Sequence, residues 1–157
     1  PAIYGSLSSS LHAKGIDVSA LFTYSLGGKI YDSTYRSLME PSFVGQTYHI
    51  NSLRAWTEAG QITDVPKITS TTTTVINDRF LIDASYFCIK SISAGYTFKT
   101  AWLEKCHIRS LRLYVSGDNL LMLSALRGLN PQSSFTGSTS YTYTPNRTVT
   151  LGVDVKF

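Results

Sequence analysis

The sequence predicts an all-β protein, namely a segment of an antiparallel transmembrane β-barrel. Residues 147–157 alternate strictly between apolar and polar side chains, over about the 9–11 residues that carry a strand across a membrane. The strand candidates are joined alternately by short and long connections, the asymmetry typical of membrane barrels. No apolar run approaches the roughly 18 residues of a membrane helix. Together these three observations favour strands over helices as the membrane-spanning elements.

Composition and motifs exclude several classes of function. The net charge is +4, but the cations are dispersed, whereas a nucleic-acid footprint is clustered, so no nucleic-acid partner is expected. His12, His49 and His107 are isolated from carboxylates and cysteines at ligand spacing, so we expect no metal and no cofactor. No Ser-His-Asp or Cys-His set has a supporting motif, and we therefore expect no catalytic residues and no enzymatic activity.

The first two strands are predicted at residues 3–13 and 16–26. Lys14-Gly15 between them is a two-residue turn signal, so the pair reads as a hairpin. Successive strand side chains point to opposite faces. The face expected to point outward from the second strand carries Ile16, Val18, Ala20, Phe22 and Tyr24.

Residues 29–80 are predicted to be a long connection. Turn signals interrupt it, and Asn51 or Ser52 is expected to cap a short helix that runs through Arg54, Trp56 and Glu58. A connection of this length is unusual in a compact soluble domain, but long external loops are usual in a barrel.

Three further strands are predicted at residues 85–98, 110–119 and 147–157. The alternation within the first of them changes phase, which a β-bulge near Lys90-Ser91 would reconcile. Residues 99–108 read as a turn with a short helix, and residues 120–144 as a second long loop. The smallest membrane barrels need eight strands, so five strands predict a piece of a larger barrel. A secretion signal is accordingly expected upstream of Pro1.

Several phrases follow one another along the chain: FTYSLGGKIY at residues 22–31, RAWTE at 54–58, NDRFLIDASYFCIK at 77–90, LRLYVSGDNL at 111–120, GLNP at 128–131, and the ending from 145 to 157. In this order and spacing they resemble the carboxy-terminal end of the SusC/RagA-type, TonB-linked outer-membrane transporters of Bacteroidetes. The resemblance covers most of the chain. The chain departs from the family pattern in the residues after Trp56 and at position 88, where it has a cysteine and the family commonly has a basic residue.

The resemblance implies a 22-stranded barrel with a plugged lumen, of which this chain would supply the last five strands. It also implies import of glycans, or of peptides, across the bacterial outer membrane, with energy from the TonB complex. The implied partners are the rest of the barrel and its plug, a SusD-like surface lipoprotein, the barrel-assembly machinery and outer-membrane lipid.

The end of the chain is a candidate recognition signal for the barrel-assembly machinery, because Val153, Val155 and Phe157 continue the apolar face to an aromatic terminus. The alternative is an ordinary amphipathic strand of a soluble sheet.

Aromatic residues in the two long loops are candidates for substrate contact, since their rings can stack on sugar rings. Loop packing and an aromatic girdle at the bilayer interface are the alternatives. Trp56 is expected to be structural. The candidates for substrate contact are Tyr35, Tyr48, Phe135 and Tyr141.

A second class of function is a soluble β-sandwich that serves as a carbohydrate-binding or adhesin module. In that case the apolar strand faces would form one buried core, and the loops would bind glycan.

Overall fold

The structure, a computed structural model, describes residues 1–40, 45–68, 76–99, 107–126, 128–134, 136–140 and 143–157. The chain divides into two compact units. The first, the sheet unit, comprises Pro1–Gly28, Asp83–Pro131 and Tyr143–Phe157. The second, the loop unit, comprises Lys29–Ile82 and Gln132–Thr142, so much of the first long connection folds as a body of its own.

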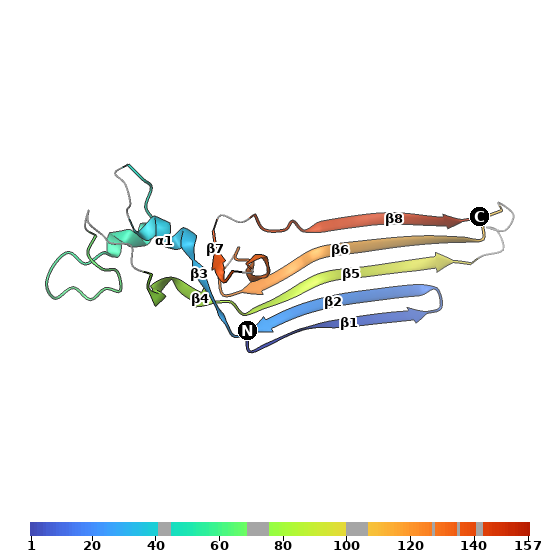
Figure 1. The fold of residues 1–157 in the computed structure, drawn as a ribbon. Helices are drawn as coiled ribbons and strands as arrows, with labels where there is room; N and C mark the ends of the chain where they lie inside the picture. Colours follow the sequence, from blue (N-terminus) through green and yellow to red (C-terminus); the bar gives the residue numbers. More distant parts are fainter. Residues whose placement is uncertain (41–44, 69–75, 100–106, 127, 135, 141–142) are drawn as a thin grey trace. The chain divides into compact units, whose positions relative to one another are not determined.

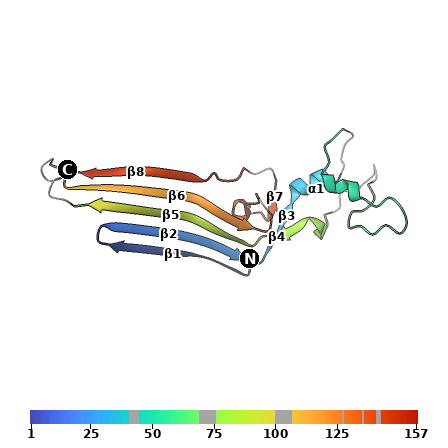
Figure 2. The ribbon, with the colours of Figure 1, turned by 180° about the vertical axis from the view of Figure 1, so that it is seen from behind.

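Five strands lie side by side in the sheet unit in the order β1-β2-β5-β6-β8 (Figures 1 and 2). All neighbouring pairs are antiparallel. The strands are β1 (Ile3–Ala13), β2 (Ile16–Leu26), β5 (Tyr86–Phe98), β6 (Ser110–Ser124) and β8 (Thr148–Lys156). The predicted hairpin is confirmed: Lys14 and Gly15 take φ values of 50° and 87°, as a tight two-residue turn requires.

One strand differs from its expected length. The sequence predicts that the fourth strand ends at Asn119, whereas β6 continues to Ser124, where it pairs with Tyr86 of β5. Asn119 has a φ of 52°, a left-handed conformation that asparagine tolerates and that is usual in turns. Here the position lies within an irregularity of the β5–β6 pairing rather than at the end of the strand. The second long connection is correspondingly shorter than residues 120–144.

The predicted bulge near Lys90-Ser91 is confirmed. The register of β5 shifts between Ile89 and Ser91 against β6, and the register of β2 against β5 shifts between Leu21 and Phe22. The Lys90 ammonium donates to Asn119 Oδ1 at 2.9 Å, which links the two irregular positions. An extra residue of this kind lets the apolar side chains before and after it reach the same face of the sheet.

The sheet has one apolar and one polar face. The register places the apolar side chains of neighbouring strands opposite one another, as in the row Leu11, Val18, Ala94, Val115 and Leu151. This apolar face stays open: Leu7, Leu151 and Val149 are 63%, 83% and 67% exposed. A large exposed apolar surface of this kind marks contact with a membrane or with another protein.

The loop unit has a small core and elements that the sequence did not predict. β3 (Lys29–Asp32) lies between β4 (Leu81–Asp83) and β7 (Ser138–Thr139), and it pairs in parallel with β7. The helix α1 (Ser33–Met39) begins where Asp32 Oδ1 accepts a hydrogen bond from the Tyr35 backbone N–H at 2.8 Å. Short 3-10 helices occupy Ile50–Arg54, Asp78–Phe80 and Pro131–Ser133. The buried cluster is Met39, Ala55, Val65 and Phe80.

The helix expected around Arg54 is shorter and is capped differently. His49, not Asn51 or Ser52, is the cap, because its ring Nδ1 accepts the Asn51 backbone N–H at 3.1 Å. The 3-10 helix ends at Arg54, since Ala55 turns extended with ψ at 144°, so Trp56 lies outside it. The short helix expected within residues 99–108 falls largely outside the described residues. No described helix is both long and apolar enough to cross a membrane.

Candidate functional site: the polar sheet face and the loop unit

A row of hydroxyl side chains crosses the whole polar face. Each of the five strands contributes one residue at the same level, since the cross-strand pairs connect without a break. The Ser19 and Ser93 hydroxyls are hydrogen-bonded at 2.8 Å. The residues of the row are Ser10, Ser19, Ser93, Ser116 and Thr150. Small hydroxyls make this part of the face polar and shallow, as the wall of a water-filled or plugged lumen requires.

An ion-pair clamp lies beside the hydroxyl row. Arg112 of β6 donates from Nε and Nη2 to the two carboxylate oxygens of Asp17 on β2, at 3.0 and 2.5 Å. Its Nη1 donates to Asp154 on β8 at 3.1 Å. The fork geometry of guanidinium suits such two-pronged pairing with a carboxylate. One side chain therefore connects three strands across four positions of the sheet.

Two glycines make room for this arrangement. A Cβ at Gly95 would lie 2.8 Å from Arg112 Nη2 and from Asp17 Oδ1, so the guanidinium can cross β5 only above a glycine. A Cβ at Gly152 would overlap the ring of Tyr114, which lies over β8. Arg112 in turn lies 4.7 Å from the Tyr114 ring centroid, within cation–π range. The cluster is a brace between strands, since the positive charge of Arg112 is already paired with two carboxylates.

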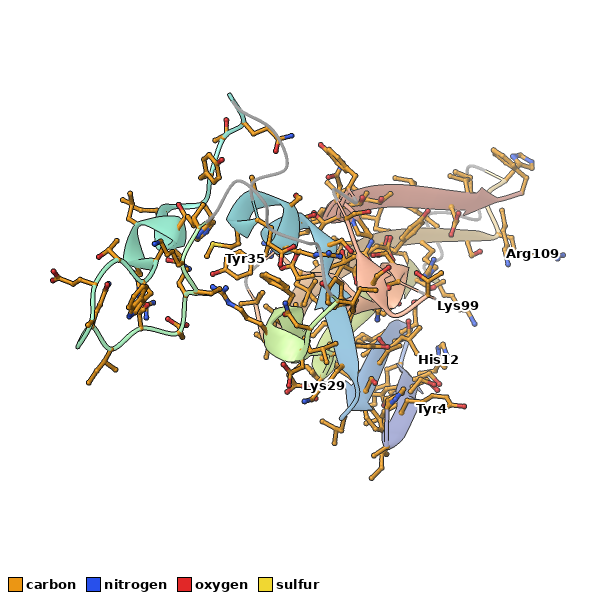
Figure 3. All side chains as sticks on the ribbon, turned by 60° about the vertical axis from the view of Figure 1, so that its left-hand side comes forward. Tyr4, His12, Lys29, Tyr35, Lys99 and Arg109 are labelled. Carbon is orange, nitrogen blue, oxygen red and sulfur yellow. The ribbon has the colours of Figure 1, made fainter. Side chains whose placement is uncertain are left out.

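The predicted substrate-contact residues are in different surroundings. Tyr35, labelled in Figure 3, is packed in the loop unit: its hydroxyl accepts from Asn51 Nδ2 at 2.8 Å, and its ring meets those of His49 and Phe80 edge-on. Tyr48 is 41% exposed. Phe135 and Tyr141 lie outside the described residues. Of the four candidates, the described part of the chain thus leaves Tyr48 the most accessible.

Several exposed apolar side chains in the loop unit, apart from Tyr48 and Trp56, are not singled out by the sequence analysis. They lie in turn-rich segments whose polar neighbours mask them, and the signal that finds them is the isolated isoleucine or leucine between turn residues. Their exposure ranges from 37% at Trp56 to 100% at Ile62. The set comprises Tyr48, Ile50, Leu53, Trp56, Ile62, Ile68, Ile76 and Leu81. An apolar side chain left in water by its own unit is a candidate contact for another protein.

The candidate assembly signal lies at one edge of the sheet. Val153, Val155 and Phe157 are exposed on the apolar side, at 61%, 42% and 86%. β8 pairs with β6 on one side, and β1 at the opposite edge pairs with β2, so both outer strands leave one row of backbone groups without a partner among the described residues. Open edges of this length call for further strands.

Charged groups outside the sheet have local structural roles. The Ser85 hydroxyl and backbone N–H both donate to Asp83 Oδ1, which lowers the pKa of that carboxyl. The hydrogen bond from Arg36 Nε to Glu40 at 2.9 Å raises the pKa of the Arg36 guanidinium. In the described part of the chain, no three His, Cys, Asp or Glu side chains gather as metal ligands.

Comparisons with known proteins give the family. No family model matches the chain. It is 30% identical over 158 residues to TonB-dependent receptor P3 of Formosa agariphila, a match that covers 94% of this chain and 15% of that protein. TonB-dependent receptor P26 of the same organism is 24% identical and is matched over 100% of this chain and 17% of its own length. The chain thus spans about a sixth of the relatives that it matches.

Solved structures agree with these relatives. The chain matches the RagAB peptide importer in the open-open state with a TM-score of 0.76 and 25% identity, over 98% of this chain and 17% of that one. The closed-closed state gives a TM-score of 0.77 at 23% identity, over 96% of this chain and 16% of that one. The two-faced antiparallel sheet with open edges is therefore a transmembrane β-barrel segment, and the chain belongs to the SusC/RagA-type TonB-dependent receptors.

Proposed function

We propose that this chain is the carboxy-terminal part of an outer-membrane active transporter that imports glycans or peptides together with a SusD-like lipoprotein. The observation that carries the proposal is the five-stranded sheet with one open apolar face, one polar face and two edges unpaired among the described residues, combined with the match to RagAB. The apolar face contacts lipid and the polar face lines the lumen. The remaining strands, the plug and the TonB-contacting segment come from the rest of the protein.

The connections give the segment its orientation. Short turns of bacterial barrels face the periplasm and long loops face the outside. The Lys14-Gly15 turn then lies on the periplasmic side, and the strand ends at Leu26 and Ser124, which lead into the long connections, lie on the external side. The segment acts as a fixed wall, since it matches the open and the closed RagAB structures equally well.

The loop unit is the proposed contact for the lipoprotein. Its exposed apolar side chains, named above, gain a partner there, and its own small core holds them in position. Of the two described candidates for substrate contact, Tyr48 is exposed and free to meet substrate, whereas Tyr35 is engaged in packing.

The soluble β-sandwich alternative is less well supported. A sandwich needs a second sheet to bury its apolar face. The other sheet among the described residues, β4-β3-β7, has strands of only 3, 4 and 2 residues, too short to cover strands of 9 to 15 residues.

The experiment uses the full-length protein and its lipoprotein. A variant with Leu53→Asp and Ile62→Asp should co-purify with several-fold less lipoprotein from detergent-solubilised outer membranes, because a charge is introduced at each apolar contact. Lys67→Asp, at an exposed polar position of the same unit, is the control and should retain the lipoprotein. Full retention by the double variant, at normal levels in the membrane, would contradict the proposed contact.

Uptake of labelled glycans and peptides by cells with and without the gene then identifies the class of substrate. If deletion of the gene abolishes the uptake of neither class, the transport proposal is wrong.

A further inference from the structure

An apolar groove is present near the short-turn end of the sheet. Its volume is about 590 Å³. Six of its lining residues belong to the apolar face, and Gly95, Tyr114 and Gly152, which alternate with them along the strands, complete it. The six are Ile16, Ala94, Tyr96, Leu113, Val115 and Leu151. The groove is therefore continuous with the lipid-contacting surface and opens onto it.

The small side chain of Ala94 accounts for the groove. Along β5 it stands between the large side chains of Ile92 and Tyr96, and across the sheet it is paired with Val18 and Val115. A single methyl group among these larger neighbours leaves a depression in the apolar face at this position. A depression in a lipid-facing surface is filled by lipid, since water gains nothing from an apolar lining.

Cations surround the short-turn end beyond the groove. Lys14 lies in the β1–β2 turn, Lys99 directly follows β5, and Arg109 directly precedes β6. Lys156 ends β8 on the polar face, two residues after Asp154. All four are exposed, and Lys99 and Arg109 are labelled in Figure 3. No ion pair involves any of them within the part of the chain that the structure describes. Asp17 and Asp154, the carboxylates of the neighbouring strand ends, are both paired with Arg112.

Backbone hydrogen bonds hold these cations at the same end of the sheet. The Thr97 N–H donates to the Gly15 carbonyl and the Arg109 N–H to the Lys156 carbonyl, each at 2.7 Å. The groove lies within one leaflet, because Ala94 and Lys99 are about 16 Å apart along an extended strand, and the usual barrel tilt of about 40° reduces this to about 12 Å of depth. One leaflet of a hydrocarbon core of about 30 Å is slightly thicker than this.

We propose that the groove and its basic rim bind one anionic phospholipid of the periplasmic leaflet. An acyl chain occupies the groove at Ala94, and the phosphate pairs with Lys14, Lys99 and Arg109. Basic residues at the membrane surface attract anionic headgroups. The inference rests on the membrane orientation given under the proposed function, and it does not depend on the imported substrate or on the lipoprotein.

The position of the acyl chain is tested with the full-length protein in nanodiscs that contain phosphatidylglycerol with a photoreactive diazirine in its acyl chain. Crosslinks should concentrate on peptides containing Ile16, Ala94 and Leu113. Ala94→Leu, which fills the groove, should reduce them at least fivefold. Ala20→Leu makes the same change on the apolar face of β2 outside the groove and should leave them unchanged. Crosslinks spread evenly over the five strands, or equal loss in both variants, would overturn the proposal.

The headgroup is tested by lipid titration and native mass spectrometry of the same protein. Each of Lys14→Gln, Lys99→Gln and Arg109→Gln should weaken binding of phosphatidylglycerol about fivefold, equivalent to about 1 kcal/mol per cation. Lys29→Gln and Lys67→Gln, in the loop unit, are the controls. Phosphatidylcholine with the same chains should bind weakly and glycerol phosphate should not compete, which distinguishes a lipid from a free phosphate.

Equal affinity for the two lipids, or displacement by glycerol phosphate, would overturn the proposal. Uptake of the labelled substrates is measured on the same variants. If the lipid site fails these tests while uptake is intact, the transport proposal is unaffected. If deletion of the gene leaves uptake unchanged, the transport proposal is wrong whatever the lipid-binding result.

Discussion

At the scale of single residues, the ion-pair clamp depends on a glycine, Gly95, which has no side chain to block it. Arg112 reaches Asp17 across β5 only because Gly95 has no Cβ. Glycine normally weakens the interior of a strand. Here it allows an ionic connection that reaches from β2 to β6 over the strand between them, and Gly152 gives the ring of Tyr114 the same freedom on β8.

Gly95→Val should destabilise the full-length barrel by about 1–3 kcal/mol, the usual cost of inserting carbon atoms into an occupied space. The measurement is the unfolding free energy from a urea titration in lipid vesicles. Thr97→Val, nearly isosteric and two residues further along the same face of β5, is the control and should change stability little. In an Arg112→Ser background the cost should be smaller, because the space is then free. An equal cost in both backgrounds would show that the guanidinium is not what the new side chain meets.

At the scale of elements, β8 has two faces with opposite requirements. Leu151 lies near its middle on the apolar face and is 83% exposed to the surroundings of the sheet. Thr150, its neighbour, lies on the polar face opposite Ser116.

Leu151→Arg should cost about 2–4 kcal/mol of unfolding free energy, as expected for a lipid-facing cation near the bilayer midplane. Thr150→Arg places the same charge on the lumen side and should cost distinctly less. Both are measured by urea unfolding of the full-length protein in vesicles. Equal costs for the two variants would mean that the faces have been assigned wrongly.

The end of the same element carries the proposed assembly signal. Removal of Phe157 should lower the amount of folded full-length protein in the outer membrane severalfold, because the assembly machinery would lose its aromatic contact. Surface labelling of intact cells measures this amount. Phe157→Tyr keeps an aromatic ring and should assemble normally. Unchanged surface levels after the removal would defeat the assignment of the signal.

At the scale of the whole molecule, the sequence predicts those features of the fold that are determined by residues close together in the chain. The strands and the bulge near Lys90 follow from a two-residue alternation and its change of phase, and both are local patterns. The extension of β6 is not predicted from the sequence, because asparagine at position 119 is typical of a turn. Only the pairing of the residues beyond Asn119 with β5 shows that the strand continues.

The folded core of the loop unit is not predicted from the sequence for a related reason. This core collects Met39 from α1, Phe80 from a 3-10 helix, and Ala55 and Val65 from the chain between them, without any period that the sequence pattern reveals. The packing of Tyr35 depends on Asn51 and His49, which lie more than ten residues away, so an aromatic residue expected to be free for substrate is in fact engaged. The ion-pair clamp likewise joins residues 95 positions apart.

The edges of β1 and β8, unpaired among the described residues, have a consequence for the cooperativity of unfolding. In a closed ring every strand has two neighbours, so the loss of one strand exposes two rows of backbone groups to a hydrocarbon solvent that cannot hydrogen-bond them. Unfolding therefore has no inexpensive starting point anywhere around the ring. The free energy of unfolding then belongs to the complete barrel, and a substitution in this segment shifts one transition that all strands of the barrel share.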